Sequence, residues 1–128
     1  MEFSARFPFD GNLSENKRLA WNPKAHRMFA ARGYKVAQGR LDLVLSFARA
    51  KAKAVFDPKR KVSVDLVVFK PNGRSDSQNF LKGCLDSVAR AIKVNDSMFE
   101  GSWRWEIDKD DPRIKIFVSQ EDLEIGKI

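Results

Sequence analysis

Residues 74–99 constrain the fold and chemistry of this chain more than any other stretch. The segment follows Pro-Asn-Gly and starts in the same loop, continues as a helical pattern from about Ser77, and ends in a carboxylate-bearing turn at Asp96. Ser75 or Asp76, or Ser77 itself, would cap the helix. One face carries apolar side chains at the three- and four-residue spacing of a buried stripe: Leu81, Cys84, Leu85, Val88 and Ile92. We therefore expect this face to pack on a core.

The opposite face of the same helix carries a row of polar groups. Asn79, Lys82 and Asp86 follow one another at i, i+3 and i+7, and Asp76 precedes them. Asp96 would begin a strand beside the helix, with its carboxylate facing that of Asp76. Two such carboxylates can share a divalent cation, because hard cations take oxygen ligands. The alternative is a solvated helix face with a capping aspartate, and for Asp86 an ion pair with Lys82 is the favoured role.

This spacing resembles the signature of the RusA-type Holliday-junction resolvases, small metal-dependent endonucleases often encoded by phages. Six residues match without a gap, and they are Arg74, Asp76, Asn79, Lys82, Asp86 and Asp96. The resemblance is close over about a quarter of the chain. It implies a homodimeric hydrolase of DNA recombination and repair that uses Mg²⁺ or Mn²⁺. Such an enzyme would cut four-way junctions, or related branched DNA, by paired nicks.

The resemblance also assigns roles to residues. It implies that Asp76, Gln78 and Asp96 hold the metal ion, which activates water. Asp76 and Asp96 then count as catalytic together with Lys82, which orients the water or neutralises the transition state. Asn79 would hold the loop or a metal ligand in place by hydrogen bonds, and Asp86 would form an ion pair with Lys82.

The chain departs from the family pattern at two positions. Gln78 stands where the family has an aspartate, and Asn95 stands where many members have the first of two acidic residues. Because an amide oxygen is neutral, Gln78 should lower the affinity for the metal. One alternative function is therefore a non-catalytic protein of the same fold that binds branched DNA. Another is a structural or regulatory protein whose basic half meets an acidic protein.

The net charge of +7 is unevenly distributed along the 128 residues. Residues 1–61 contain 14 Lys and Arg against 5 Asp and Glu, whereas residues 62–128 contain 10 against 12. A basic half joined to a half with candidate carboxylates suits a protein that binds polyanions, although charge also serves solubility. The predicted DNA contacts are Lys17, Arg18, Lys24, Arg27, Lys59, Arg60, Lys61 and Arg74.

The remaining pattern predicts a single α+β domain over residues 1–128. Its sheet would be mixed, with about four strands, two helices on one face, and a basic hairpin or flap near the N-terminus. The predicted segments are a strand over 2–9, an open hairpin over 16–38 with a turn at Arg32-Gly33, a helix over 36–55, a central strand over 61–69, and paired strands over 99–107 and 114–118.

Rare residue types exclude several classes of site. The single Cys84 excludes an internal disulfide and a multi-cysteine zinc site, and its place on the apolar helix face predicts a core residue. The single His26 excludes a His-rich metal site and a serine triad, and we expect it at the surface. There is no apolar run of membrane-spanning length, and the first residues lack a signal-peptide pattern. A cytoplasmic location is the simplest expectation.

Overall fold

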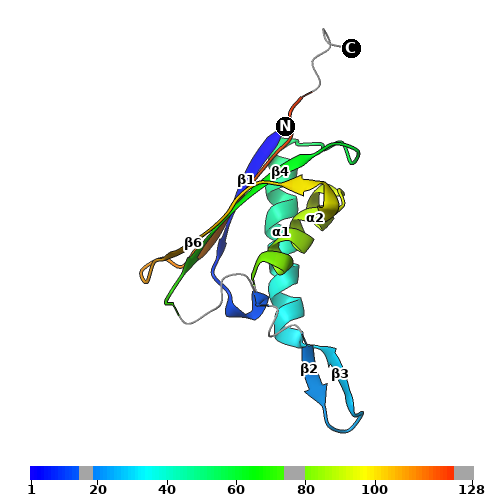
Figure 1. The fold of residues 1–128 in the computed structure, drawn as a ribbon, viewed down its shortest axis with the longest axis vertical. Helices are drawn as coiled ribbons and strands as arrows, with labels where there is room; N and C mark the ends of the chain where they lie inside the picture. Colours follow the sequence, from blue (N-terminus) through cyan, green and yellow to red (C-terminus); the bar gives the residue numbers. More distant parts are fainter. Residues whose placement is uncertain (15–18, 74–79, 123–128) are drawn as a thin grey trace.

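The structure is a computed structural model of the chain. It describes residues 1–14, 19–73 and 80–122, with the backbone alone at 19–22, 27, 29 and 30. The strands are β1 (Glu2–Pro8), β2 (Leu19–Asn22), β3 (Arg27–Ala30), β4 (Val62–Lys70), β5 (Phe99–Glu100), β6 (Trp103–Ile107) and β7 (Arg113–Ser119). The helices are α1 (Arg32–Ala52) and α2 (Leu81–Ile92), with short 3-10 turns at Gly11–Leu13 and Asp96–Met98. This order confirms a single α+β domain, and β2 and β3 form the expected hairpin (Figure 1).

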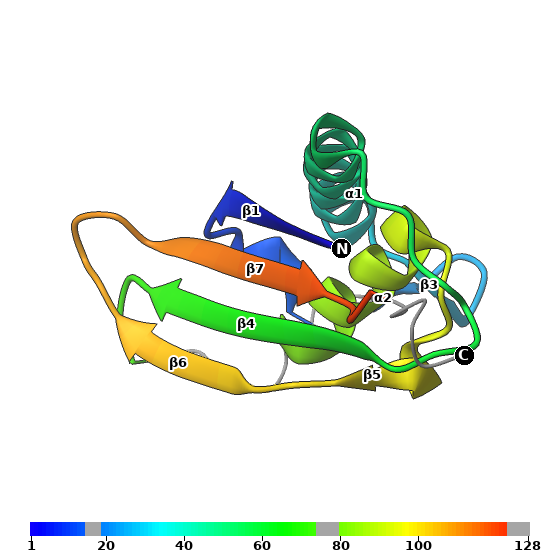
Figure 2. The ribbon, with the colours of Figure 1, turned by 90° about the horizontal axis from the view of Figure 1, so that it is seen from above.

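The main sheet is mixed and has one covered face. Its order is β1–β7–β4, with β5 and β6 both parallel to β4 along the far edge of β4. Figure 2 shows both helices on the same side of the sheet. Every second residue of β4, from Val62 to Lys70, is buried beneath them, as the alternating sequence requires. The predicted mixed sheet with two helices on one face is therefore confirmed.

The predicted pairing of the last two long strands is wrong. β6 and β7 do not form a hairpin, because each pairs with an opposite edge of β4. The reason is the helix α2, which carries the chain from β4 back to β6 in the parallel sense. The turn after β6 then crosses the end of β4, where the Asp108 N–H donates to the Lys70 carbonyl at 2.8 Å.

Helix α1 begins earlier than its periodicity predicts. Arg32 and Gly33, predicted as a turn, form its first residues. The helix ends at Ala52, because Lys53 adopts a left-handed conformation with φ of 53°. Its core face carries Ala37, Leu41 and Leu45, which follow one another at four-residue spacing and are buried. The described helices include none that is both long enough and apolar enough to cross a membrane.

Helix α2 is rotated slightly from the predicted orientation. Cys84, Val88 and Ile92 are buried as expected, whereas Leu81 and Leu85 are only half-buried. Burial raises the pKa of the Cys84 thiol to about 12, which fits a core residue rather than a reactive one. Leu81 and Leu85 therefore lie at the margin of the core, where they also line the space next to β6.

Candidate functional site

A cleft lies between helix α2 and the edge strand β6. Its volume is about 490 Å³. The lining side chains are Leu81, Lys82, Leu85, Asp96, Trp103 and Trp105. Two of the residues singled out in the sequence, Lys82 and Asp96, thus lie together here. An apolar, aromatic floor with one cation and one carboxylate at its rim is the composition typical of a binding site.

The register of β6 on β4 places both tryptophans in the cleft. Trp103 is opposite Leu66 and Trp105 is opposite Val68. Leu66 and Val68 point towards the helices, and neighbouring residues of paired strands share a face, so the tryptophans point the same way. Trp105 packs against the core, while Trp103 keeps 37% of its surface exposed. An exposed indole face is therefore available inside the cleft.

The start of β6 is fixed by a close approach to β4. Gly101 has φ of 149°, and a Cβ atom there would collide with the Val64 carbonyl oxygen. Next to it, Asp65 Oδ1 accepts hydrogen bonds from the Ser102 backbone N–H at 3.1 Å and from the Ser102 hydroxyl at 2.9 Å. These contacts position Trp103, the following residue.

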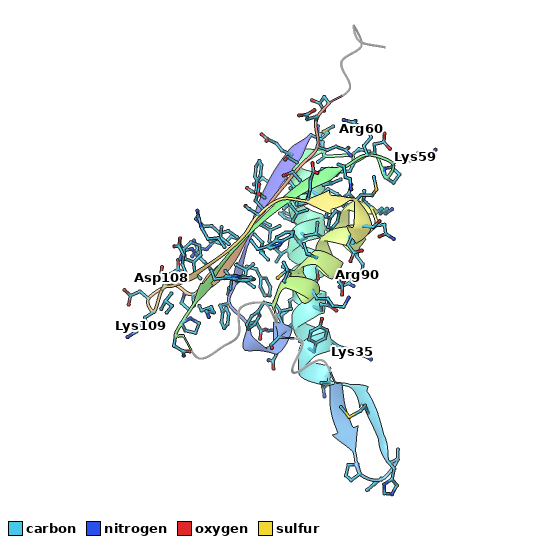
Figure 3. The ribbon with its side chains drawn as sticks, in the orientation of Figure 1. Lys35, Lys59, Arg60, Arg90, Asp108 and Lys109 are labelled. Atoms are coloured by element: carbon cyan, nitrogen blue, oxygen red, sulfur yellow. The ribbon has the colours of Figure 1, made fainter. Side chains whose placement is uncertain are left out.

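Charged groups continue from the cleft along α2. Lys82 Nζ lies 3.7 Å from Asp86 Oδ2, which is the ion pair expected at i, i+4. Asp86 and Asp96 both line a second, shallower pocket of about 280 Å³, together with Arg90. Arg90 lies on the outer side of α2 (Figure 3) and donates two hydrogen bonds of 3.0 Å to Asp42. The Asp42 hydrogen bond raises the pKa of Arg90, so this cation is held in place beside the carboxylates.

Asn95, one of the two departures from the family pattern, has a local structural role. Its Oδ1 accepts a 2.9 Å hydrogen bond from the Ser97 N–H and caps the 3-10 turn Asp96–Met98. An asparagine suits this position because its side chain orders the turn that carries Asp96.

The predicted metal site is described only in part. Asp76, Gln78 and Asn79 lie outside the described residues, so of the three predicted ligands only Asp96 can be placed. Within residues 1–14, 19–73 and 80–122, no group of three His, Cys, Asp or Glu side chains gathers to hold a metal. Mg²⁺ therefore stays a prediction.

The predicted DNA contacts do not form one surface among the described residues. Lys24 lies in the turn of the β2–β3 hairpin, which extends from one end of the molecule (Figure 1). Lys59 and Arg60 lie at the opposite end (Figure 3), where Arg60 donates to the Glu121 carbonyl. Lys61 lines a pocket beside Arg60 and Glu100. Lys17, Arg18 and Arg74 lie outside the described residues, as does the side chain of Arg27.

The sequence reading missed the lining of the cleft. The sequence predicts a strand over 99–107 and places Leu81 and Leu85 in the core, without bringing Trp103 and Trp105 next to them. The available signal was the Trp-x-Trp repeat on a strand that follows an amphipathic helix. That signal identifies an aromatic face, but only the parallel pairing of β6 with β4 shows that α2 stands over it.

Comparisons with known proteins give weak structural likenesses. No protein-family model matches the chain, and a comparison with curated proteins found no match. One similar structure is IspF of Plasmodium falciparum in a CDP complex, with 12% identity, 91% of this chain and 90% of that chain covered, and a TM-score of 0.38. Another is a CDP-bound 2C-methyl-D-erythritol-2,4-cyclodiphosphate synthase, with 10% identity, 91% and 95% covered, and a TM-score of 0.36.

These comparisons contradict the expected identity and activity. No family model of a junction endonuclease matches, and the two similar structures named above are cyclodiphosphate synthases rather than nucleases, so the prediction of a RusA-type, metal-dependent junction endonuclease is wrong. The predicted roles in DNA hydrolysis, recombination and repair are therefore also wrong. At TM-scores of 0.38 and 0.36 the likeness assigns no other activity to this chain.

Proposed function

We propose that this protein binds DNA by taking unpaired bases into the cleft between α2 and β6. The observation that supports the proposal is the pair of tryptophans in that cleft, with Lys82 at its rim. Base stacking on aromatic side chains contributes about 1–3 kcal/mol per base and tolerates any sequence. The Lys82 side chain is 52% exposed, and its ammonium group can contact the phosphate that follows a stacked base.

The dimensions of the cleft favour single bases over duplex DNA. A volume of about 490 Å³ is that of a small-ligand pocket. Bases inside a duplex are stacked on their neighbours, and extracting one from the stack costs a few kcal/mol. Branched DNA, the predicted partner, has strained or unpaired bases where its arms meet, and single-stranded DNA offers them throughout. Both should bind better than a plain duplex.

The net positive charge of the chain favours a polyanionic partner, but carboxylates beside the cleft oppose the approach of phosphates. A net charge of +7 attracts phosphates at long range. Asp86 and Asp96, beside the cleft, repel them at short range. A divalent cation between these carboxylates and a phosphate would remove the repulsion, so Mg²⁺ is retained as part of the proposal, and it should strengthen binding. A homodimer and a cytoplasmic location also remain predictions.

The test is a binding titration followed by fluorescence anisotropy. Labelled single-stranded DNA, a four-way junction and a duplex of matched sequence would each be titrated, with Mg²⁺ and with chelator. Single-stranded DNA and the junction should bind more tightly than the duplex, and binding should weaken steeply between about 50 and 200 mM salt.

Replacing the exposed tryptophan tests the cleft itself. Trp103→Ala should raise the dissociation constant about tenfold or more, because one stacking contact is lost. Phe117→Ala is the matched control, since Phe117 is similarly exposed (39% against 37% for Trp103) but lies on the opposite face of the sheet. Equal losses in the two variants, or equal affinity for duplex and single strand, would refute the proposal.

A further inference from the structure

The strand β1 has a free edge next to an exposed apolar surface of α1. β1 pairs with β7 on one side, and no described strand pairs with its other side. Along that edge, residues 3–6 and one face of α1 line a largely apolar groove of about 750 Å³. Leu43 and Phe47 form part of its wall, and they are 73% and 72% exposed. Free strand edges of this kind are sites where another strand can add.

The hydrogen bonds between β1 and β7 show which backbone N–H and C=O groups of β1 point towards its free edge. The Phe9 N–H donates to the Pro112 carbonyl, and the Gln120 N–H donates to the Met1 carbonyl. In an antiparallel ladder, bonded and non-bonded pairs alternate, so the odd-numbered residues of β1 bond to β7. The N–H and C=O groups of Glu2, Ser4 and Arg6 therefore point away from β7, towards the free edge.

We propose that a second copy of this chain occupies this edge, with the two β1 strands antiparallel about a two-fold axis at Ser4. In this register Glu2 faces Arg6 of the partner subunit, and Ser4 faces Ser4 of the partner subunit. Every outward N–H from Glu2 to Arg6 then finds a carbonyl. The sheet continues across the dimer, which is an isologous interface.

Charge and backbone chemistry select this register over its neighbours. A shift by one residue would pair groups that already bond to β7, so only shifts by an even number keep the ladder. One such shift sets Glu2 against Pro8 of the partner subunit, which has no N–H to donate. Another sets Arg6 against Arg6 of the partner subunit, which is repulsive. The proposed register instead places Glu2 opposite Arg6 of the partner subunit, and the two-fold axis repeats this opposite-charge pair.

The two faces of the continued sheet are both consistent with this arrangement. The side chains of Glu2, Ser4 and Arg6 are exposed on the face opposite the helices, where Arg6 already forms an ion pair with the exposed Asp111. Adding Glu2 of the partner subunit extends that pair into a network. On the helix face, the second copy covers Leu43 and Phe47, whose exposure the single chain leaves unexplained.

A backbone substitution tests the edge directly. Ser4→Pro removes the outward N–H at the two-fold axis and leaves the bonds to β7 intact, because proline is tolerated where the N–H faces away from the sheet. The dimer dissociation constant, measured by sedimentation velocity over a range of concentrations without DNA, should rise at least about tenfold. Ser4→Thr keeps the N–H and should leave that constant unchanged.

A charge exchange tests the register. Glu2→Arg alone and Arg6→Glu alone should each weaken the dimer, since each creates two like-charge pairs. The double variant should restore association to near the original strength. Asp111→Asn is the control, because it removes the partner of Arg6 within the chain and should not weaken the dimer.

Hydrogen exchange distinguishes this interface from any other, even if the proline variant fails to fold. Raising the protein concentration should protect the amides of Glu2, Ser4 and Arg6, while those of Phe3 and Ala5 are already protected. A monomer at all concentrations would overturn the proposal, as would a dimer whose even-numbered β1 amides stay unprotected. These measurements contain no DNA, so their failure is separate from a failure of the proposed DNA binding.

Discussion

Single residues at the junction of β5 and β6 determine the geometry of the cleft. Gly101 permits the backbone to approach Val64, and Asp65 then holds Ser102 through two hydrogen bonds. Without this close approach, β6 could not follow β5 along the same edge of β4 with Trp103 facing α2.

Replacing this glycine should be costly. Gly101→Ala is expected to lower the free energy of unfolding by more than about 2 kcal/mol, because a Cβ atom collides with β4 and φ of 149° disfavours any side chain. Urea unfolding followed by circular dichroism gives the value. Gly39→Ala is the matched control: its Cβ meets nothing within 4 Å in the middle of α1, so it should stabilise by about 0.5–1 kcal/mol. Similar effects of the two substitutions would contradict the close approach.

At the residue scale, the sequence predicted burial better than it predicted surface sites. Cys84 and Val88 followed from helical periodicity, since a buried stripe depends on local spacing alone. Leu81 and Leu85 occupy the same stripe but lie at its margin, and there a small rotation of α2 decides between core and cleft. The spacing of apolar residues along α2 does not determine that rotation, because the rotation depends on the elements against which α2 packs.

At the scale of elements, the turn between β6 and β7 is organised by one ion pair. Asp108 accepts hydrogen bonds from Arg113 Nη1 at 2.8 Å and from the N–H groups of Asp110 and Asp111. The Arg113 hydrogen bond is the main reason that the pKa of Asp108 is lowered. Arg113 in turn covers the Phe69 ring at 3.7 Å, so the pair ties the turn to β4.

This pair predicts a specific dependence of stability on pH. A carboxylate whose pKa is lower in the folded state stabilises the fold above its unfolded pKa, near 3.8, and loses that contribution as pH falls through the folded value. Asp108→Asn should therefore be less stable than wild type at pH 7, and the difference should shrink below pH 3.8. Urea unfolding at several pH values measures it, with Asp110→Asn as control. A difference that persists at low pH would contradict the role of the ion pair.

Strand and helix positions were predictable, whereas strand pairing was not. β1 and β4 follow from alternation, and α1 follows from its periodicity to within about one turn at either end. A short turn joins β6 and β7, and such a connection favours a hairpin. The hairpin does not form, because β6 and β7 pair with opposite edges of β4. Helix α2 returns the chain so that β6 runs parallel to β4. That choice depends on contacts distant in the sequence.

At the scale of the whole molecule, the basic residues are spread rather than gathered. The β2–β3 hairpin and the turn that carries Lys59 and Arg60 lie at opposite ends of the molecule (Figures 1 and 3), whereas the tryptophan cleft lies between α2 and β6. Net charge was readable from the sequence, but its distribution in space was not. A DNA strand bound in the cleft would lie beside Lys82, and the distant cations would act on it mainly through the long-range field.

The measurement that tests the proposed site most directly is photo-crosslinking of single-stranded DNA that carries 5-iodouracil, followed by tryptic digestion and mass spectrometry. Excited iodouracil reacts with an aromatic ring that stacks on it, so the crosslink reports which aromatic side chain holds a base. We predict that the modified peptide is residues 94–104, which contains Trp103. Crosslinks confined to the peptide that contains Phe117, on the opposite face of the sheet, would contradict base binding in the cleft.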